Sequence, residues 1–130
     1  MRRFSVLLVD DHEGFLNAAG RHFRSTPWVE IVGRALNGLQ AVEMAEALKP
    51  DAVLMDLAMP EMGGLQACRL IKAQDDPPYV AIISHFDDAQ HREYAVRAGA
   101  DAFVSKLSYL QDALPLLARW AGEEPGDASP

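Results

Sequence analysis

Residues 52–60 read Ala-Val-Leu-Met-Asp-Leu-Ala-Met-Pro, an apolar run that ends abruptly in an aspartate. The run from Ala52 to Met55 lacks the polar alternation of a strand that faces water on one side, so it is typical of a strand buried on both faces. Two other short runs, Phe4 to Val9 and Val80 to Ile83, have the same character. We therefore predict three central strands of a parallel sheet.

The segments between these runs have the spacing of amphipathic helices. Apolar side chains recur every three or four residues in three segments, at Phe15, Ala19 and Phe23, at Val42, Ala45 and Leu48, and at Leu65, Cys68 and Ile71. Two weaker strands, Val29 to Ala35 and Ala102 to Ser105, extend the alternation of strand and helix. Five such units predict an open parallel sheet with helices on both faces, because right-handed crossovers return each helix over the sheet.

Polar residues mark both ends of the second helix. Asn37, with Gln40 three residues later, is typical of a helix N-cap whose partner side chain reaches back to a free backbone N–H. Pro50 prevents the same helix from running past Lys49, since the residue before a proline disfavours helical geometry. A helix over about 38–49 is therefore expected.

The ends of the last two helices are less well defined. Asp87 or Asp88 can cap the fourth helix, and Gly99 supplies its left-handed stop. The last helix is predicted from about Leu110 to Trp120. Pro115 is tolerable there only in or near the first turn, where a missing N–H has little effect.

The composition is that of a globular domain with an acidic balance. The 130 residues are 49% hydrophobic, and 19 acidic against 12 basic side chains give a formal charge of −7. Such a field repels phosphate backbones and anionic headgroups, so we expect this chain to bind no nucleic acid directly and no membrane. Short apolar runs and the lack of a recognisable signal peptide predict a cytoplasmic location. Cys68 is the only cysteine and is expected to pack in the core.

Polar side chains follow four of the predicted strands at their carboxyl ends, where ligands of open parallel sheets bind. They are Asp10 and Asp11, Asp56, Ser84, and Lys106. Three carboxylates gathered there repel one another unless a cation compensates them, and an all-oxygen donor set favours magnesium over zinc. Lys106 and Ser84 can bind phosphate oxygens, which leaves Asp56 as a nucleophile that would form an acyl phosphate.

Four segments in this order resemble the response-regulator receiver domains of two-component signalling, over nearly the whole chain to about residue 121. They are 8–12 (Leu-Val-Asp-Asp-His), 55–60 (Met-Asp-Leu-Ala-Met-Pro), 81–84 (Ala-Ile-Ile-Ser) and 98–106 (Ala-Gly-Ala-Asp-Ala-Phe-Val-Ser-Lys). The spacing of 22 residues from Ser84 to Lys106 also matches. The combination is specific, whereas one Asp-Asp pair alone would not be. The resemblance implies a flavodoxin-like, doubly wound (βα)5 fold whose five-stranded parallel sheet has the order 2-1-3-4-5.

The resemblance also implies the chemistry of the acidic residues. Asp10, Asp11 and Asp56, with the backbone carbonyl of Ala58, would bind Mg2+. Asp56 would be the phosphoacceptor, and a sensor histidine kinase or phosphotransfer protein would be the donor. The protein would be a switch that catalyses only its own phosphorylation and dephosphorylation, and not a turnover enzyme.

In the same family, Lys106 and Ser84 would bind the phosphoryl group, and Ser84 and Phe103 would be switch residues. They would alter the face formed by the fourth helix, the strand 102–105 and the last helix, which would control an output domain or protein partner. The sequence looks most like regulators with a helix-turn-helix output domain, and a phosphorylation-dependent homodimer is compatible with it. Phe103 is equally explained as an ordinary core residue, because an aromatic ring in a short buried strand needs no further role.

Three residues near the predicted site depart from the usual pattern of the family. His85 stands where a small residue is common, and its bulk is expected to narrow access to the phosphoryl group. Ala58 and Phe86 are apolar at positions that influence how water reaches the acyl phosphate. We predict slowed dephosphorylation.

Three other functions fit parts of the pattern. A magnesium-dependent phosphohydrolase of the haloacid dehalogenase type also uses an aspartyl nucleophile, but it needs a second acid where Ala58 stands. An inert receiver-like domain would bind partners without phosphorylation. A flavin-binding protein of similar topology would need a Ser/Thr/Gly-rich phosphate loop where Asp10 and Asp11 stand.

Residues 1–121 are expected to form one receiver domain, and residues 122–130 a flexible tail or the start of a linker. The tail is polar and proline-containing and has almost nothing apolar to bury. Four residues, His85, Asp87, Asp88 and His91, lack a recognised metal-ligand spacing, and we interpret them as caps and surface residues.

Overall fold

The computed structural model describes residues 2–86 and 88–122. Within them strands and helices alternate as predicted. The strands are β1 (Phe4–Val9), β2 (Val29–Ala35), β3 (Ala52–Asp56), β4 (Tyr79–Ser84) and β5 (Ala102–Ser105). The helices are α1 (Glu13–Arg24), α2 (Gly38–Leu48), α3 (Gly64–Lys72), α4 (Ala89–Arg97) and α5 (Tyr109–Gly122). Strands β3 and β4 extend slightly beyond their predicted bounds.

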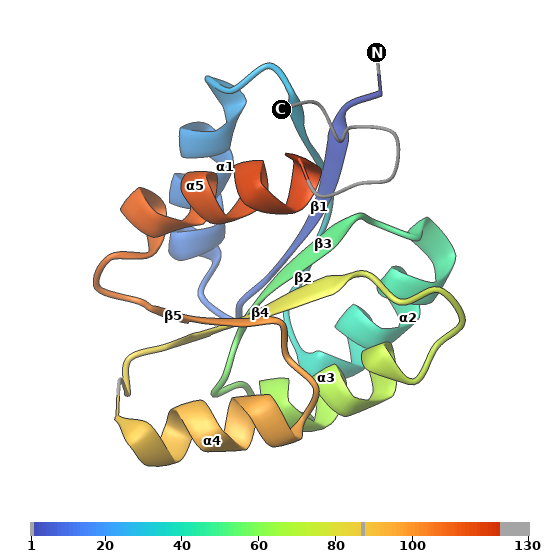
Figure 1. Ribbon diagram of the computed structural model, residues 1–130, viewed down its shortest axis with the longest axis vertical. Coiled ribbons are helices and arrows are strands. Elements are labelled where there is room, and N and C mark those ends of the chain that lie inside the picture. The colour runs from blue at the N-terminus through green and yellow to red at the C-terminus, as the bar shows by residue number, and fades with distance from the viewer. Residues whose placement is uncertain (1, 87, 123–130) are drawn as a thin grey trace.

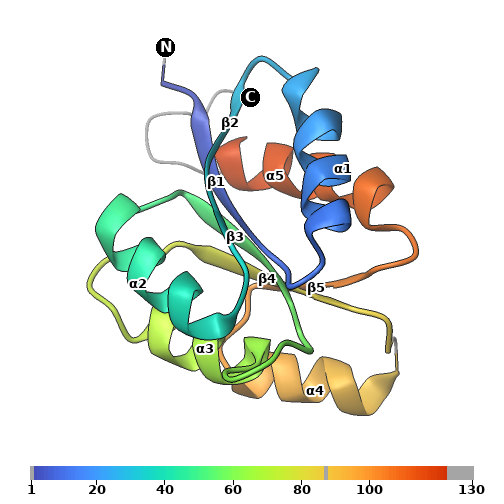
Figure 2. The ribbon, with the colours of Figure 1, turned by 180° about the vertical axis from the view of Figure 1, so that it is seen from behind.

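The five strands form one parallel sheet in the order β2-β1-β3-β4-β5, which confirms the predicted fold. Helices α1 and α5 cover one face of the sheet, and α2, α3 and α4 cover the other (Figures 1 and 2). Because β1 lies between β2 and β3, the winding direction reverses there. The carboxyl ends of β1 and β3 therefore border the crevice in which such sheets place their chemistry.

The central strands are apolar at every position because both of their faces are covered. In β1, Val6 and Leu8 pack in the core beneath α1 and α5, whereas Leu7 and Val9 pack in the core beneath α2 and α3. Burying one such side chain contributes about 1.5–3 kcal/mol, so these strands anchor the sheet. Asp56 is the last residue of an otherwise wholly apolar buried strand.

The predicted helix caps are present. Asn37 Oδ1 accepts the backbone N–H of Gln40 at 2.9 Å, and the Gln40 side chain accepts the N–H of the residue before the cap, also at 2.9 Å. Asp88 caps α4 by accepting the N–H of His91 at 2.8 Å. The alternative cap Asp87 lies outside the described residues. Gly99 follows α4 with a φ of 91°, the left-handed geometry expected of it.

The expectation for Pro115 was wrong. Helix α5 already begins at Tyr109, so Pro115 lies in its second turn and not near its start. The missing N–H leaves the carbonyl of Gln111 without its usual partner, but Gln111 and Pro115 are both exposed, so water can satisfy that carbonyl. The helix runs to Gly122, and the rest of the predicted tail lies outside the described residues.

Two expectations from composition concern the apolar parts of the chain. No helix of the described chain has the length and apolar character needed to cross a membrane.

Cys68 is buried in α3, where its Sγ lies 3.4 Å from the carbonyl oxygen of Ala98. Burial raises the pKa of the Cys68 thiol to about 11, so it is an inert core residue as predicted.

Candidate functional site

Buried polar residues gather at the carboxyl edge of the sheet. Asp10, Asp56, Ser84 and Lys106 are the polar or charged residues that are buried within the described chain. They belong to the ends of four different strands, as the sequence predicted. Charged side chains are almost never buried unless they are paired, so this group marks the edge as a candidate site.

Lys106 joins two of the carboxylates. Its Nζ lies 2.7 Å from Asp10 Oδ2 and 3.3 Å from Asp56 Oδ1, and all three side chains are at most 6% exposed. The lysine follows β5, and its backbone N–H donates to the carbonyl of Ser84 at 2.8 Å, which fixes the base of its side chain against β4. Residues that are 96 and 50 positions apart in the chain thus meet in one ion-pair network.

Asp11 lies beside this network and is not bonded to Lys106. One of its oxygens, Oδ1, is buried and has no hydrogen-bond partner. The Nδ1 atom of His12 lies 3.3 Å from this oxygen, but its hydrogen bond is made with Asp10 Oδ1 at 3.2 Å. Ligand atoms of Asp10, Asp11 and His12 lie within 4.8 Å of one another. An orphaned carboxylate oxygen among oxygen donors fits a hard divalent cation such as Mg2+.

Asp56 carries an electrostatic penalty of its own. Burial raises the pKa of its carboxyl group, the charge of Asp10 raises it further, and Lys106 opposes both effects. The protein alone therefore does not provide enough positive charge for Asp56 to ionise as easily as it does in water. A cation bound beside it would favour the ionised form.

The turn after β3 holds Asp56 through its backbone. Leu57 donates its N–H to the carbonyl of Ile83 at 2.8 Å and accepts the N–H of Gly64 at 2.8 Å. A Cβ atom at Gly64 would collide with the carbonyl oxygen of Asp56, so α3 can begin this close to the strand only with glycine. Ala58 lies in this turn, two residues after Asp56, and is exposed.

Ser84 ends β4, and its hydroxyl is engaged with the following loop. Its Oγ accepts the backbone N–H of Phe86 at 2.9 Å. This bond uses an acceptor lone pair, so the hydroxyl hydrogen can still be donated to another oxygen. The Phe86 ring is 55% exposed and stacks on His91, with ring centroids 4.9 Å apart. His91 also contacts its cap residue Asp88, Nδ1 to Oδ1 at 2.7 Å, and His85 is exposed.

Phe103, in β5, is neither fully buried nor fully exposed. It is partly buried and packs against the core beneath α2, α3 and α4. The guanidinium of Arg92, in α4, lies 4.9 Å from the centroid of its ring. Phe103 is therefore in contact with both the core and α4, and the arrangement fits either of its two predicted roles.

Sequence reasoning missed two aromatic residues of the site. The ring of Phe15 lies 4.5 Å from Lys106 Nζ and stacks on Tyr109 at 5.1 Å, with the ring planes 12° apart. Both residues follow a site residue closely in the chain, Phe15 after the acidic pair and Tyr109 after the lysine. That spacing was a usable signal, but Phe15 also fitted the apolar stripe of a helix.

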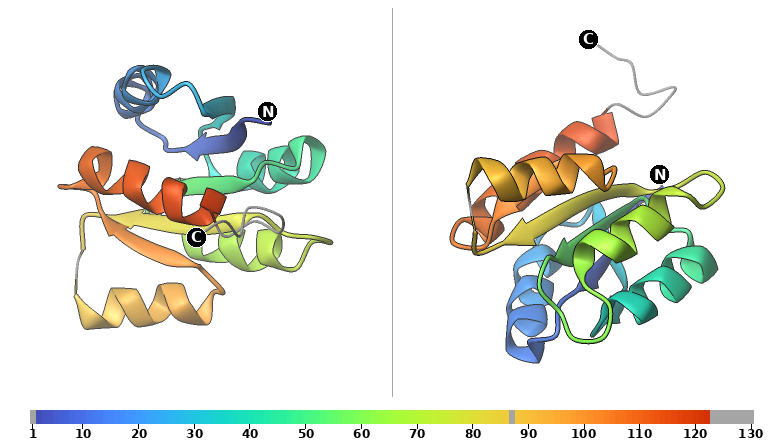
Figure 3. Two further views of the ribbon diagram at one scale, coloured as in Figure 1. Left: turned by 45° about the horizontal axis from the view of Figure 1, so that its top comes forward. Right: turned by 90° about the horizontal axis from the view of Figure 1, so that it is seen from below.

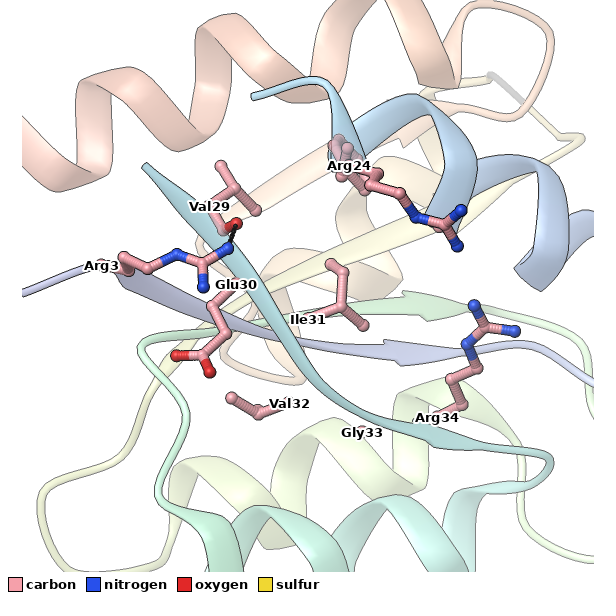
Figure 4. A pocket seen from close by; sticks show the side chains of 10 residues that line it. Arg3, Arg24, Val29, Glu30, Ile31, Val32, Gly33 and Arg34 are labelled. Atoms are coloured by element: carbon pink, nitrogen blue, oxygen red, sulfur yellow. Dashed lines mark hydrogen bonds between the residues drawn. The ribbon is translucent and has the colours of Figure 1, made fainter. Parts of the chain in front are cut away.

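A cavity of about 480 Å³ lies away from this edge, beside β2 (Figure 4). Its rim includes Arg3, Arg24 and Arg34. Arg3 donates to the backbone carbonyls of Pro27 and Val29, and Arg34 donates to Asn17 Oδ1 at 2.7 Å. Because β2 is an edge strand, charged side chains and the irregular register between β1 and β2 protect it from unwanted pairing.

Comparisons with known proteins agree with this geometry. The family described as "Response regulator receiver domain" matches residues 6–116. The chain is 36% identical over 101 residues to an uncharacterized transcriptional regulatory protein, YhcZ, of Bacillus subtilis, covering 78% of this chain and 47% of the relative. It is 31% identical over 120 residues to the nitrate/nitrite response regulator protein NarL of Escherichia coli, covering 92% of this chain and 56% of that protein.

Solved structures give the same result. The signal receiver domain of the putative response regulator NarL from Mycobacterium tuberculosis superposes with a TM-score of 0.88 at 28% identity, covering 95% of this chain and all of that one. The response regulator domain of Thermotoga maritima CheB superposes with a TM-score of 0.86 at 30% identity and equal coverage. The chain spans about half the length of the two curated relatives named above. On its sequence and its fold, the chain belongs to the response regulator receiver domains of two-component signalling.

Proposed function

We propose that Asp56 is the phosphoacceptor of this receiver, and that a histidine kinase or phosphotransfer protein is the donor. Asp10, Asp11 and Asp56, with the backbone carbonyl of Ala58, would hold Mg2+. Lys106 and Ser84 would bind phosphoryl oxygens. The observation that carries the proposal is the buried lysine bridge between Asp10 and Asp56, next to an oxygen of Asp11 that has no hydrogen-bond partner.

The chemistry follows from the charges. A carboxylate oxygen of Asp56 attacks phosphorus, the phosphorus–nitrogen bond of the donor phosphohistidine breaks, and its electron pair and a proton remain with the imidazole. Lys106 exchanges a carboxylate contact for a phosphoryl oxygen, and Ser84 turns its hydroxyl hydrogen toward another. When bound, Mg2+ supplies positive charge that offsets the repulsion between the carboxylates and the incoming phosphoryl group. Dephosphorylation is a separate reaction: water attacks phosphorus, the bond between phosphorus and the Asp56 oxygen breaks, and inorganic phosphate leaves while the carboxylate is restored.

Phosphorylation would change the conformation of the elements that follow Ser84 and surround Phe103. Ser84 is bonded to the start of the β4–α4 loop, and Phe103 lies beneath Arg92 of α4. A new bond from Ser84 to the phosphoryl group would therefore pull on the loop that precedes α4. Helix α4 adjoins β5, which leads into α5 (Figure 3). We propose that these three elements form the face that controls an output domain or protein partner.

The function is tested by incubating the protein with acetyl phosphate and Mg2+ and measuring its intact mass. The wild type should gain one phosphoryl group only with Mg2+, and Asp56→Asn should gain none. Asp51→Asn is the matched control, because Asp51 precedes the same strand at its other end, and it should be modified normally. Modification of Asp56→Asn at the wild-type rate would exclude Asp56 as the acceptor.

The same incubation separates a switch from a phosphohydrolase. We propose that the protein catalyses its own phosphorylation and dephosphorylation and does not turn over free phosphate esters. Phosphate released from a generic phosphate ester in many turnovers, measured beside the mass assay, would instead support the hydrolase alternative. A chain that is never modified but binds partners would support the inert receiver-like alternative.

A further inference from the structure

We propose that the ring of Phe15 positions the ammonium group of Lys106, an inference that rests on the phosphoacceptor function proposed above. Lys106 Nζ lies 4.5 Å from the centroid of this ring, within the range in which the negative face of an aromatic ring attracts a cation. The lysine side chain is 4% exposed, so water does not compete for its charge. The contact is therefore stronger than the same pair would be on a surface.

The ring is itself held in place from two elements. Phe15 lies in the first turn of α1, where its backbone N–H donates to the carbonyl of His12 at 3.0 Å. Its ring stacks nearly parallel on Tyr109, the first residue of α5, which is only 4% exposed. A buried partner and a helix start leave the ring little freedom, so it forms a fixed wall beside the lysine.

The ring of Phe15 lies where it can hold the Lys106 ammonium next to an incoming phosphoryl group. Two contacts of that ammonium, Asp10 Oδ2 and Asp56 Oδ1, are the groups beside which a phosphoryl oxygen would arrive. A lysine side chain is long and flexible, and its ammonium is a compact charge without a preferred direction. The ring offers that charge an apolar, electron-rich neighbour that need not move when the carboxylate contact is exchanged for a phosphoryl contact. Phe15 thus acts through Lys106 and does not itself touch the substrate.

Simple packing would also explain an aromatic ring here, since Phe15 is partly buried against the core. Replacement by leucine does not distinguish the two roles, because it alters shape and charge distribution together. Fluorinated phenylalanines do distinguish them, because each added fluorine weakens the negative face of the ring and hardly changes its size. The decisive variants are 4-fluoro-, 3,5-difluoro- and 3,4,5-trifluorophenylalanine, introduced at position 15 alone.

The rate of Mg2+-dependent phosphorylation by acetyl phosphate is then measured by intact mass. We expect a stepwise decrease along the series that reaches between about threefold and about thirtyfold, the span from an exposed to a desolvated cation–ring contact. The matched control is the same series at Phe23, which lies on the same helix and is fully buried. That series should leave the rate unchanged. A flat series at position 15 would overturn the inference.

A second experiment asks whether the effect passes through the lysine. In a Lys106→Met background, the series at position 15 should become flat, because interacting residues are not additive. A decrease that persisted there would assign Phe15 a packing role only. An NMR measurement without Mg2+ keeps this test independent of phosphorylation: the ε-methylene protons of Lys106 should shift upfield in the ring current of Phe15. The shift should vanish in Phe15→Leu and remain in Phe23→Leu, and its absence from the wild type would overturn the inference even if Asp56 is phosphorylated normally.

Discussion

The buried carboxyl group of Asp56 makes the stability of the fold depend on pH. Its folded-state pKa is raised above the unfolded value, first by burial and then by Asp10. The unfolded chain therefore loses this proton at a lower pH than the folded chain. The contribution of Asp56 to stability declines as pH rises from about 3.8 through the raised pKa, and the penalty is fully present above it.

We expect Mg2+ to reverse this penalty. At a hundred times its dissociation constant, Mg2+ should raise the free energy of unfolding of the wild type by about 2.7 kcal/mol, as any ligand specific to the folded state does. Without Mg2+ at pH 7, Asp56→Asn should melt at a higher temperature than the wild type. At the same Mg2+ concentration, the free energy of unfolding of Asp56→Asn should rise much less than that of the wild type, because the variant lacks one of the carboxylates. Thermal unfolding followed by circular dichroism measures both, and equal Mg2+ shifts in the two proteins would remove Asp56 from the metal site.

We expect Ala58 and Phe86 to lengthen the lifetime of the phosphoprotein. Both side chains are exposed, so polar replacements should change the free energy of unfolding by less than about 0.5 kcal/mol. Ala58→Asn and Phe86→Lys can orient a water molecule toward the acyl phosphate, and together they should shorten its half-life by about tenfold or more. Decay of the phosphorylated mass after removal of acetyl phosphate measures this. Leu48→Asn is the control, because Leu48 is an apolar residue that is 44% exposed and precedes the start of β3, whereas Asp56 lies at the end of that strand. An unchanged half-life would show that neither residue limits hydrolysis.

Helix α3 begins where it does because Gly64 lets it approach β3. Gly64→Ala should force the backbone of Asp56 to move, which costs about 1–3 kcal/mol of stability and slows phosphorylation. Gly63→Ala is the matched control, since a Cβ atom there would lie 3.4 Å from the nearest atom, the carbonyl oxygen of Leu57. Denaturant unfolding and the mass assay together test this. Equal effects of the two variants would mean that the close approach at Gly64 is unimportant.

The elements that the sequence predicted best are those whose signal is local. A strand buried on both faces is continuously apolar, and the cap at Asn37 and the left-handed stop at Gly99 depend on one or two residues each. Pro115 was misplaced because its tolerance depends on which side of α5 faces water, which only packing decides. Likewise, the strand-end position of Lys106 could be read from the chain. The ring beside it was harder to predict: Phe15 follows the acidic pair closely, but its contact with Tyr109 forms only when α1 and α5 meet in the folded molecule.

The whole molecule presents one edge that is suited to a partner. Beyond β5, which ends the sheet, two exposed apolar side chains lie on the neighbouring elements: Val96 of α4 is 70% exposed and Leu107, between β5 and α5, is 88% exposed. Val96 is one helical turn after Arg92, which covers Phe103, so both α4 residues lie toward β5. Val96 lies near the end of α4 that leads into the start of β5, and Leu107 follows the end of β5, so the two side chains flank the strand. Exposed apolar residues of this kind occur on interaction surfaces.

We expect this edge to be used by a second copy of the chain when the receiver is activated. Beryllofluoride with Mg2+ should shift the wild type toward a dimer in sedimentation velocity, because the pull of Ser84 on the β4–α4 loop would reset α4 beside β5. Val96→Asp with Leu107→Asp would bury charges in that interface, so the variant should stay monomeric, or bind at least about tenfold more weakly, while it is phosphorylated normally. Leu70→Asp is the control, since Leu70 is an exposed apolar residue of α3 and away from β5. If the double variant dimerised as well as the wild type, the interface would lie elsewhere on the molecule. If neither protein dimerised, the exposed pair would be left to a different partner, such as an output domain.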